Sequence, residues 1–148
     1  MHQGDTQNLI NQIYKINDVS TFQKYKLTKD DVTKTDTDDR TPFFHACEAG
    51  KLEIAEYLYE IEPSTISMKA TNDRTPLHVA CQRGHLPIVH FLLDRHAEVN
   101  AVTRQNETPL HLVAKECHSK IVEILLDYHI NSRFFSNVKM ANQINLNI

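Results

Sequence analysis

Histidine and cysteine are the residue types in this sequence that could most directly bind a metal ion. The 148-residue chain contains nine histidines and three cysteines, and His78-x-x-Cys81 and Cys117-His118 look like ligand pairs. A structural zinc ion needs four such ligands around one point. The three cysteines are instead 34 and 36 residues apart, which is the spacing of a structural repeat. We therefore predict no metal site and no cofactor, and keep a Cys/His metal-binding protein as an alternative.

A cysteine activated by a histidine could also act as a nucleophile. Cys47 and Cys81 fall on the apolar side of a predicted helix, where free cysteine acts as a small core residue. No orienting third group, oxyanion motif or Gly-x-Ser-x-Gly elbow is recognisable. Three glycines are also too few for a Gly-rich phosphate-binding loop. The sequence therefore predicts a protein that is not an enzyme.

The carboxylates are dispersed along the chain, and Asp36, Asp38 and Asp39 form one small acidic cluster. This cluster lacks the twelve-residue calcium loop with glycine at its sixth position and glutamate at its twelfth. We therefore interpret it as the solvated tip of a hairpin.

Charge and length exclude several classes of protein. Sixteen Lys and Arg against nineteen Asp and Glu give a formal charge of −3, without the basic surplus of a nucleic-acid-binding protein. No apolar run reaches the roughly 20 residues of a membrane span, and we recognise no secretory signal at the N-terminus. An odd number of cysteines favours reduced thiols, and hence the cytoplasm or the nucleus. We expect one domain and a monomer.

Three segments that begin with Thr-Pro recur at offsets of 34 and 33 residues, at Thr41, Thr75 and Thr108. A threonine before proline predicts a helix start, because the hydroxyl caps a free N–H and proline at the first position loses no hydrogen bond. Gly50 and Gly84 predict helix ends, since glycine adopts the left-handed conformation at low cost. A second apolar stripe of helical spacing follows each segment. The repeating unit is therefore turn, helix, turn, helix, with a tight turn expected two residues before each threonine at Asp39, Asp73 and Asn106.

These segments resemble the ankyrin repeat, whose Thr-Pro-Leu-His signature appears in the second and third units. The resemblance implies an all-α solenoid of stacked helix-turn-helix units joined by hairpin-like turns. Its expected divisions are a degenerate N-terminal capping repeat (1–35), three repeats (36–69, 70–102 and 103–133) and a tail or frayed cap (134–148). In this register Leu92 and Leu125 are expected to be buried between helix layers.

Several positions depart from the family pattern. Phe44 stands where the signature histidine is expected, and Cys117 stands in place of the inter-helix glycine, so a cysteine must adopt a positive φ there. The glycine that usually follows the outer helix is replaced by Glu62, His96 and His129.

The histidines differ in their expected roles. His78 and His111 occupy the signature position, which the resemblance implies is bonded to the backbone of the turn. His45 is out of that register, so we expect it to be exposed.

The resemblance implies a non-catalytic scaffold or adaptor that binds a protein on the concave surface of hairpin tips and inner helices. A run of three arginines, Arg40, Arg74 and Arg83, suggests a partner with an acidic segment, because arginine is favoured at interfaces. Glu107 occupies the equivalent hairpin position in the third repeat, so the charge of the predicted surface should change from positive to negative there. The predicted binding residues are Asp38, Arg40, Glu48, Asn72, Arg74, Gln82, Arg83, Arg104, Gln105, Glu107 and Lys115.

Two further hypotheses remain open. The chain could be the ankyrin-repeat fragment of a larger enzyme or channel. Asn100, which follows Glu98 and Val99 and lies eight residues after Leu92, is similar to the asparagines that are hydroxylated in many ankyrin repeats.

Overall fold

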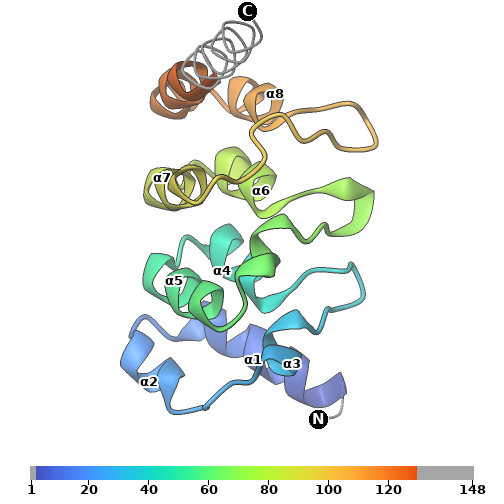
Figure 1. Cartoon of the computed structure of the whole chain (residues 1–148), viewed down its shortest axis with the longest axis vertical. Coiled ribbons are helices and arrows are strands. Elements are labelled where there is room, and N and C mark those ends of the chain that lie inside the picture. Colours follow the sequence, from blue (N-terminus) through green and yellow to red (C-terminus); the bar gives the residue numbers. More distant parts are fainter. Residues whose placement is uncertain (1–2, 130–148) are drawn as a thin grey trace, which may run out of the picture.

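The computed structural model describes residues 3–129, which form a stack of paired helices (Figure 1). One column contains the inner helices α1 (Gln3–Lys15), α4 (Pro42–Ala49), α6 (Pro76–Arg83) and α8 (Pro109–Lys115). The other contains α2 (Val19–Gln23), α5 (Leu52–Ile61), α7 (Leu86–Asp94) and helical residues 119–129. The predicted all-α solenoid is confirmed. The tail predicted at 134–148 lies outside the described residues.

The three later inner helices begin as the sequence predicts. The hydroxyls of Thr41, Thr75 and Thr108 each accept a hydrogen bond from the backbone N–H three residues further on, and each is followed by proline. These bonds satisfy donors that have no partner within the helix. The local sequence therefore determines where each inner helix starts.

The turns between inner and outer helices use left-handed residues. Gly50 and Gly84 have φ of 71° and 77°, and Cys117 has φ of 59°, as expected for a cysteine in a glycine position. A Cβ atom on Gly50 would lie 2.7 Å from the ring of His85, which belongs to the next unit. Glycine at position 50 thus avoids the strain of a left-handed residue and leaves room for the close approach of the next repeat.

The loops before the inner helices are matching hairpin turns, and they form the right-hand edge of Figure 1. In each loop a backbone N–H bonds to the carbonyl oxygen four residues later: Asp36 to Arg40, Ala70 to Arg74, and Thr103 to Glu107. Asp39, Asp73 and Asn106 have positive φ, as predicted. Neighbouring loops are joined by further backbone bonds, from Thr71 N–H to Asp38 and from Arg104 N–H to Asn72.

The core lies between the layers of helices. Leu92 and Leu125 are 0% and 2% exposed, as expected from the repeat register. The Phe91 ring lies 5.7 Å from Tyr59 and 6.4 Å from Phe43, measured between ring centroids, which links two units through aromatic contacts.

Some local structure was not predicted. A short helix, α3 (Lys29–Thr33), follows α2, and two 3-10 turns, η1 (Pro63–Ser67) and η2 (Thr71–Asp73), precede α6. At the missing turn glycines, His96 takes a φ of 61°, whereas Glu62 is extended with φ of −147°. A proline directly after Glu62 explains the difference, since it disfavours helical backbone at the preceding residue.

Candidate protein-interaction surface

One side chain from each inner helix lies in a row along the stack. Tyr14, Glu48, Gln82 and Lys115 are separated by 34, 34 and 33 residues, so they occupy the same position of α1, α4, α6 and α8. The Tyr14 hydroxyl donates to Glu48 Oε2 over 3.0 Å. The row is thus physically continuous between the first two units.

A second row is formed by the last residues of the three hairpin loops, Arg40, Arg74 and Glu107. Each lies eight positions before the inner-helix residue of the first row in the same repeat. Arg40 Nη1 lies 3.9 Å from Glu48 Oε2, Arg74 donates to the side-chain oxygen of Gln82, and Lys115 forms an ion pair with Glu107. We call the surface made by these two rows and the exposed hairpin tips the inner face. The folding of each loop back onto its helix creates it.

Glu48 is the most connected residue of the inner face. Its carboxylate accepts from Tyr14 and from Arg83 Nη2 of α6, the latter over 3.0 Å. Burial opposes ionisation, but the bonds from Arg83 and Tyr14 outweigh it and lower the pKa of Glu48. Glu48 therefore ties three successive inner helices together as an anion.

A hollow of about 210 Å³ opens between the first two hairpin loops. It is lined by Asp38, Arg40, Phe44, Glu48, Ala70, Thr71, Asn72 and Arg74. Five of these were predicted to bind a partner, and the loop fold brings them together. Phe44, where the signature histidine is expected, is only 3% exposed and supplies apolar surface.

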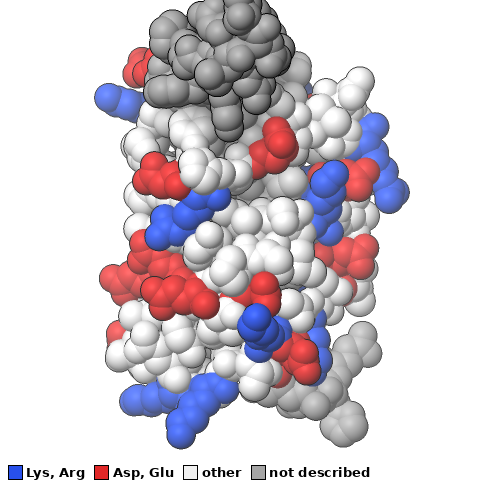
Figure 2. Space-filling view, viewed as in Figure 1, with Lys and Arg blue, Asp and Glu red and all other residues white. Residues whose placement is uncertain are grey.

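The remaining predicted residues lie further along the stack. Arg104 and Gln105 are exposed at the third hairpin tip, where Arg104 Nε lies 3.4 Å from Asp73 Oδ2. Ion pairs bring basic and acidic side chains together on the inner face, and charges of both signs are also interspersed over the view in Figure 2. The structure therefore shows a surface of mixed charge, in which Arg40 and Arg83 have carboxylate partners.

The family comparison agrees with this geometry. Residues 9–103 and 61–135 match the model of the family described as ankyrin repeats (3 copies). The chain belongs to the ankyrin repeat family. Members of this family are generally protein-interaction modules. A comparison with curated proteins found no match.

The ankyrin signature histidine has its implied role at His78. Its Nε2–H donates to the Glu107 carbonyl oxygen over 3.1 Å, and its Nδ1 accepts from the Thr75 N–H. His111 likewise accepts from the Thr108 N–H. These bonds join each inner helix to its own loop, and at His78 also to the next loop.

The expectation that His45 is exposed is wrong. His45 is 3% exposed, with Nε2 2.9 Å from Asp36 Oδ2 and Nδ1 2.8 Å from the Tyr14 hydroxyl. Burial lowers its pKa, although the bond to Asp36 acts in the opposite direction. The reason is that α1 covers this side of α4, and no feature near His45 in the sequence indicates that contact.

The interpretation of Asp36 as part of a solvated tip is also wrong. Its side chain is 8% exposed and accepts from the N–H groups of Asp38 and Arg40 as well as from the guanidinium of Arg40. Burial acts against ionisation, but these bonds and that from His45 lower the pKa of Asp36. Asp36 holds the first hairpin loop in shape, and only Asp38 and Asp39 are exposed.

Sequence reasoning missed Tyr14, which is 46% exposed beside Glu48. Its position 34 residues before Glu48 is the repeat period, so extending the register into the weakly matching N-terminal segment would have found it. Tyrosine is enriched in the centres of protein interfaces. Tyr14 therefore extends the inner face onto α1.

Burial opposes the nucleophilic and metal-binding roles that the sequence suggested for the cysteines. Cys47 and Cys81 are buried, and burial raises the pKa of the Cys81 thiol to about 12 and that of Cys47 further still. Within residues 3–129 no three His, Cys, Asp or Glu side chains are placed to hold a metal ion. No helix in that range is long and apolar enough to cross a membrane.

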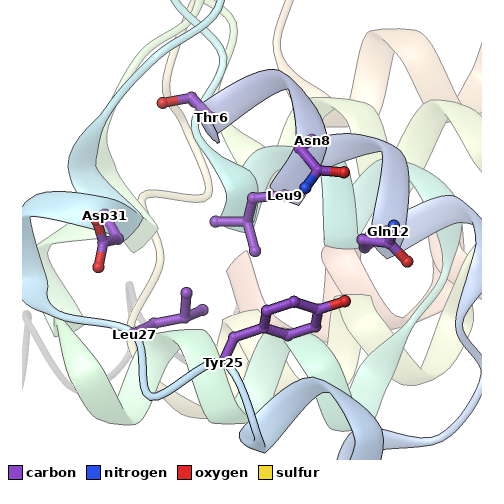
Figure 3. A pocket seen from close by; sticks show the side chains of 7 residues that line it. All are labelled: Thr6, Asn8, Leu9, Gln12, Tyr25, Leu27 and Asp31. Carbon is purple, nitrogen blue, oxygen red and sulfur yellow. The ribbon is translucent and has the colours of Figure 1, made fainter. Parts of the chain in front are cut away.

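A second, smaller hollow of about 100 Å³ lies at the N-terminal end, between α1 and α3 (Figure 3). Leu9, Tyr25 and Leu27 point toward one another across it, and polar side chains surround them. The Asp31 carboxylate at its edge is already bonded to the N–H and hydroxyl of Thr28. This hollow is remote from the inner-face rows of α6 and α8.

Proposed function

We propose that this ankyrin-repeat chain is a non-catalytic scaffold or adaptor that binds a protein partner along its inner face. The observation that supports the proposal is the hollow between the first two hairpin loops. It gathers five predicted binding residues beside the Phe44 ring, and one of them, Glu48, accepts a hydrogen bond from the exposed Tyr14. A hollow with an aromatic floor and a polar rim has the composition of a protein interface.

The proposal includes a partner with an acidic segment, binding to a monomer in the cytoplasm or the nucleus. Three free cysteines support a reducing compartment. Arginines at the hairpin tips support acidic recognition.

A pull-down from cell extract tests the function. Wild type is compared with a triple alanine variant of Arg40, Arg74 and Arg83, and with a control variant in which Glu53, Glu60 and Glu123 on the outer helices become alanine. We expect the first variant to lose bound proteins that the control retains. Retention by the first and loss by the control would place binding on the outer helices and contradict the proposal.

A further inference from the structure

In two of the three repeats an ion pair joins the hairpin loop to the inner helix of the same repeat, and the second repeat differs. In the first repeat Arg40, the last hairpin residue, pairs with Glu48 eight positions later. In the third repeat the two charges are exchanged, and the hairpin residue Glu107 pairs with Lys115 eight positions later. In the second repeat the equivalent residues are Arg74 and Gln82, so the guanidinium meets a neutral amide oxygen. The second repeat alone leaves its hairpin charge uncompensated by its own helix.

No surrounding carboxylate in the described part of the chain forms a close ion pair with Arg74, although Glu48 and Glu107 act on its charge from a longer distance. Arg40 lies 2.9 Å from Asp36, 3.1 Å from Asp38 and 3.9 Å from Glu48, and Arg83 lies 3.0 Å from Glu48. Within residues 3–129 no carboxylate forms an ion pair with Arg74, whose guanidinium donates a hydrogen bond to Gln82. Arg74 is nonetheless half-buried, so its charge is partly removed from water.

Arg74 also lines a hollow that could receive a side chain of a partner. It lines the hollow of about 210 Å³ together with Thr71 and Asn72, both of which are exposed. That volume corresponds to several waters at about 30 Å³ each, enough for an acidic side chain. A half-buried guanidinium at the wall of such a hollow is suited to a charge-assisted hydrogen bond with an incoming anion.

We propose that Arg74 is the anchor for one aspartate or glutamate side chain of a protein partner, held in the hollow between the first two hairpin loops. This inference rests on the proposed function and names the partner chemistry of the same surface. Asp38 and Glu48 line the same hollow, which favours a singly charged carboxylate over a doubly charged phosphate. Arg40 and Arg83 are already held in ion pairs with carboxylates of this chain.

Gln82 gives the most direct test, because Gln82→Glu restores the charge pattern of the other two repeats. The new carboxylate should form an ion pair with Arg74 and so compete with the carboxylate of the partner. A display library of short linear peptides is first selected on the wild-type protein. Each retained peptide is then synthesised with its Asp or Glu residues changed, one at a time, to Asn or Gln.

We expect one such change per peptide to weaken binding to wild type by roughly tenfold or more, as for the loss of a charged hydrogen bond. The same change should have no further effect on Arg74→Gln. Gln82→Glu should bind the unchanged peptides at least tenfold more weakly, while its melting temperature is equal or higher. The remote control Lys120→Gln, on an exposed position of the last outer helix, should change binding by less than about twofold.

Two results would overturn the anchor and leave the proposed function standing. The first is peptides that bind the inner face without needing a carboxylate. The second is a carboxylate effect that persists in Arg74→Gln. If no peptide is retained, or if bound peptides protect the outer helices from hydrogen exchange and leave the hairpin loops unprotected, the proposed function fails together with the anchor.

Discussion

Single residues at the turns decide how closely the repeats stack. The His85 ring lies over Gly50 and donates from Nε2 to the Glu48 carbonyl oxygen over 2.9 Å, and His118 does the same at Gly84 and Gln82. Each histidine thus joins its repeat to the helix end of the previous one. The turn glycines are needed for this contact as well as for their φ.

Gly50→Ala should destabilise the protein by about 1–3 kcal/mol, the usual cost of a non-glycine residue in a left-handed conformation, with the collision against His85 adding to it. Chemical denaturation measures this. Because the collision disappears without the ring, the double variant with His85→Ala should lose less than the sum of the two single variants. An additive result would contradict the contact.

Cys117→Gly should stabilise the protein by about 1 kcal/mol, because φ is 59° at that position and glycine has no Cβ to strain. The melting temperature should rise. A lower value would mean that the cysteine side chain makes a favourable contact outweighing its backbone strain.

Asn100 hydroxylation stays a prediction. The residue is exposed after α7, and its N–H bonds to Glu98. Mass spectrometry of protein expressed in animal cells should show a gain of one oxygen on the peptide containing Asn100. Its absence, or its persistence in Asn100→Ala, would remove the hypothesis.

At the scale of elements, stability comes from packing between helices that are too short to be stable alone. Leu92 in α7 is fully buried in the core between layers. Leu92→Ala should cost about 2–5 kcal/mol in a denaturant titration, as in other core truncations. Leu126→Ala is the matched control, because Leu126 is 43% exposed. A loss below about 1 kcal/mol at Leu92 would contradict the packing.

The contact between α1 and α4 should respond to acid through His45. Its pKa is lowered in the fold, so the unfolded chain binds the proton more readily below about pH 6.5. Stability should therefore fall as the pH drops through this region. The lowered pKa values of Asp36 and Glu48 act at lower pH, where those groups protonate.

His45→Gln should reduce the slope of unfolding free energy against pH between about pH 5 and 6.5. His78 retains its share of that slope in the variant, because burial lowers its pKa too. His90→Gln, at an exposed position of α7, is the matched control for the loss of a histidine. An unaltered slope in His45→Gln would show that His45 does not set the acid response.

Along the whole molecule, the charge at the last hairpin position changes sign within the mixed charges of the inner face. The hairpin position is arginine in the first two repeats and Glu107 in the third. An extended partner should align its acidic part with the first two hairpins, and charges at the rim of an interface act chiefly on the rate of association.

Arg74→Glu should slow the association of an identified acidic partner and weaken its dependence on salt, measured by stopped-flow mixing or surface plasmon resonance. Lys120→Glu on the outer side makes the same change in net charge and should have a much smaller effect. Equal effects of the two would indicate that only net charge matters.

The features that depend on neighbouring residues alone could be predicted from the sequence. The Thr-Pro caps, Gly50 and Gly84 fix the ends of the inner helices, and Asp39 predicts the hairpin turn through its tolerance of positive φ. Their period established the stack and its buried leucines. These features are local, so they can be recognised without knowing what packs against them.

The pairing of the polar groups, in contrast, depends on how the repeats pack in three dimensions. His45 is buried because α1 covers it, and Glu48 binds Tyr14 and Arg83, residues 34 and 35 positions away. Of the three arginines that look alike in the sequence, Arg40 and Arg83 form ion pairs with carboxylates, whereas Arg74 is half-buried and bonds to the neutral Gln82. The physical reason is that a charge acts through distance in space, and those distances are set by how one repeat packs on the next.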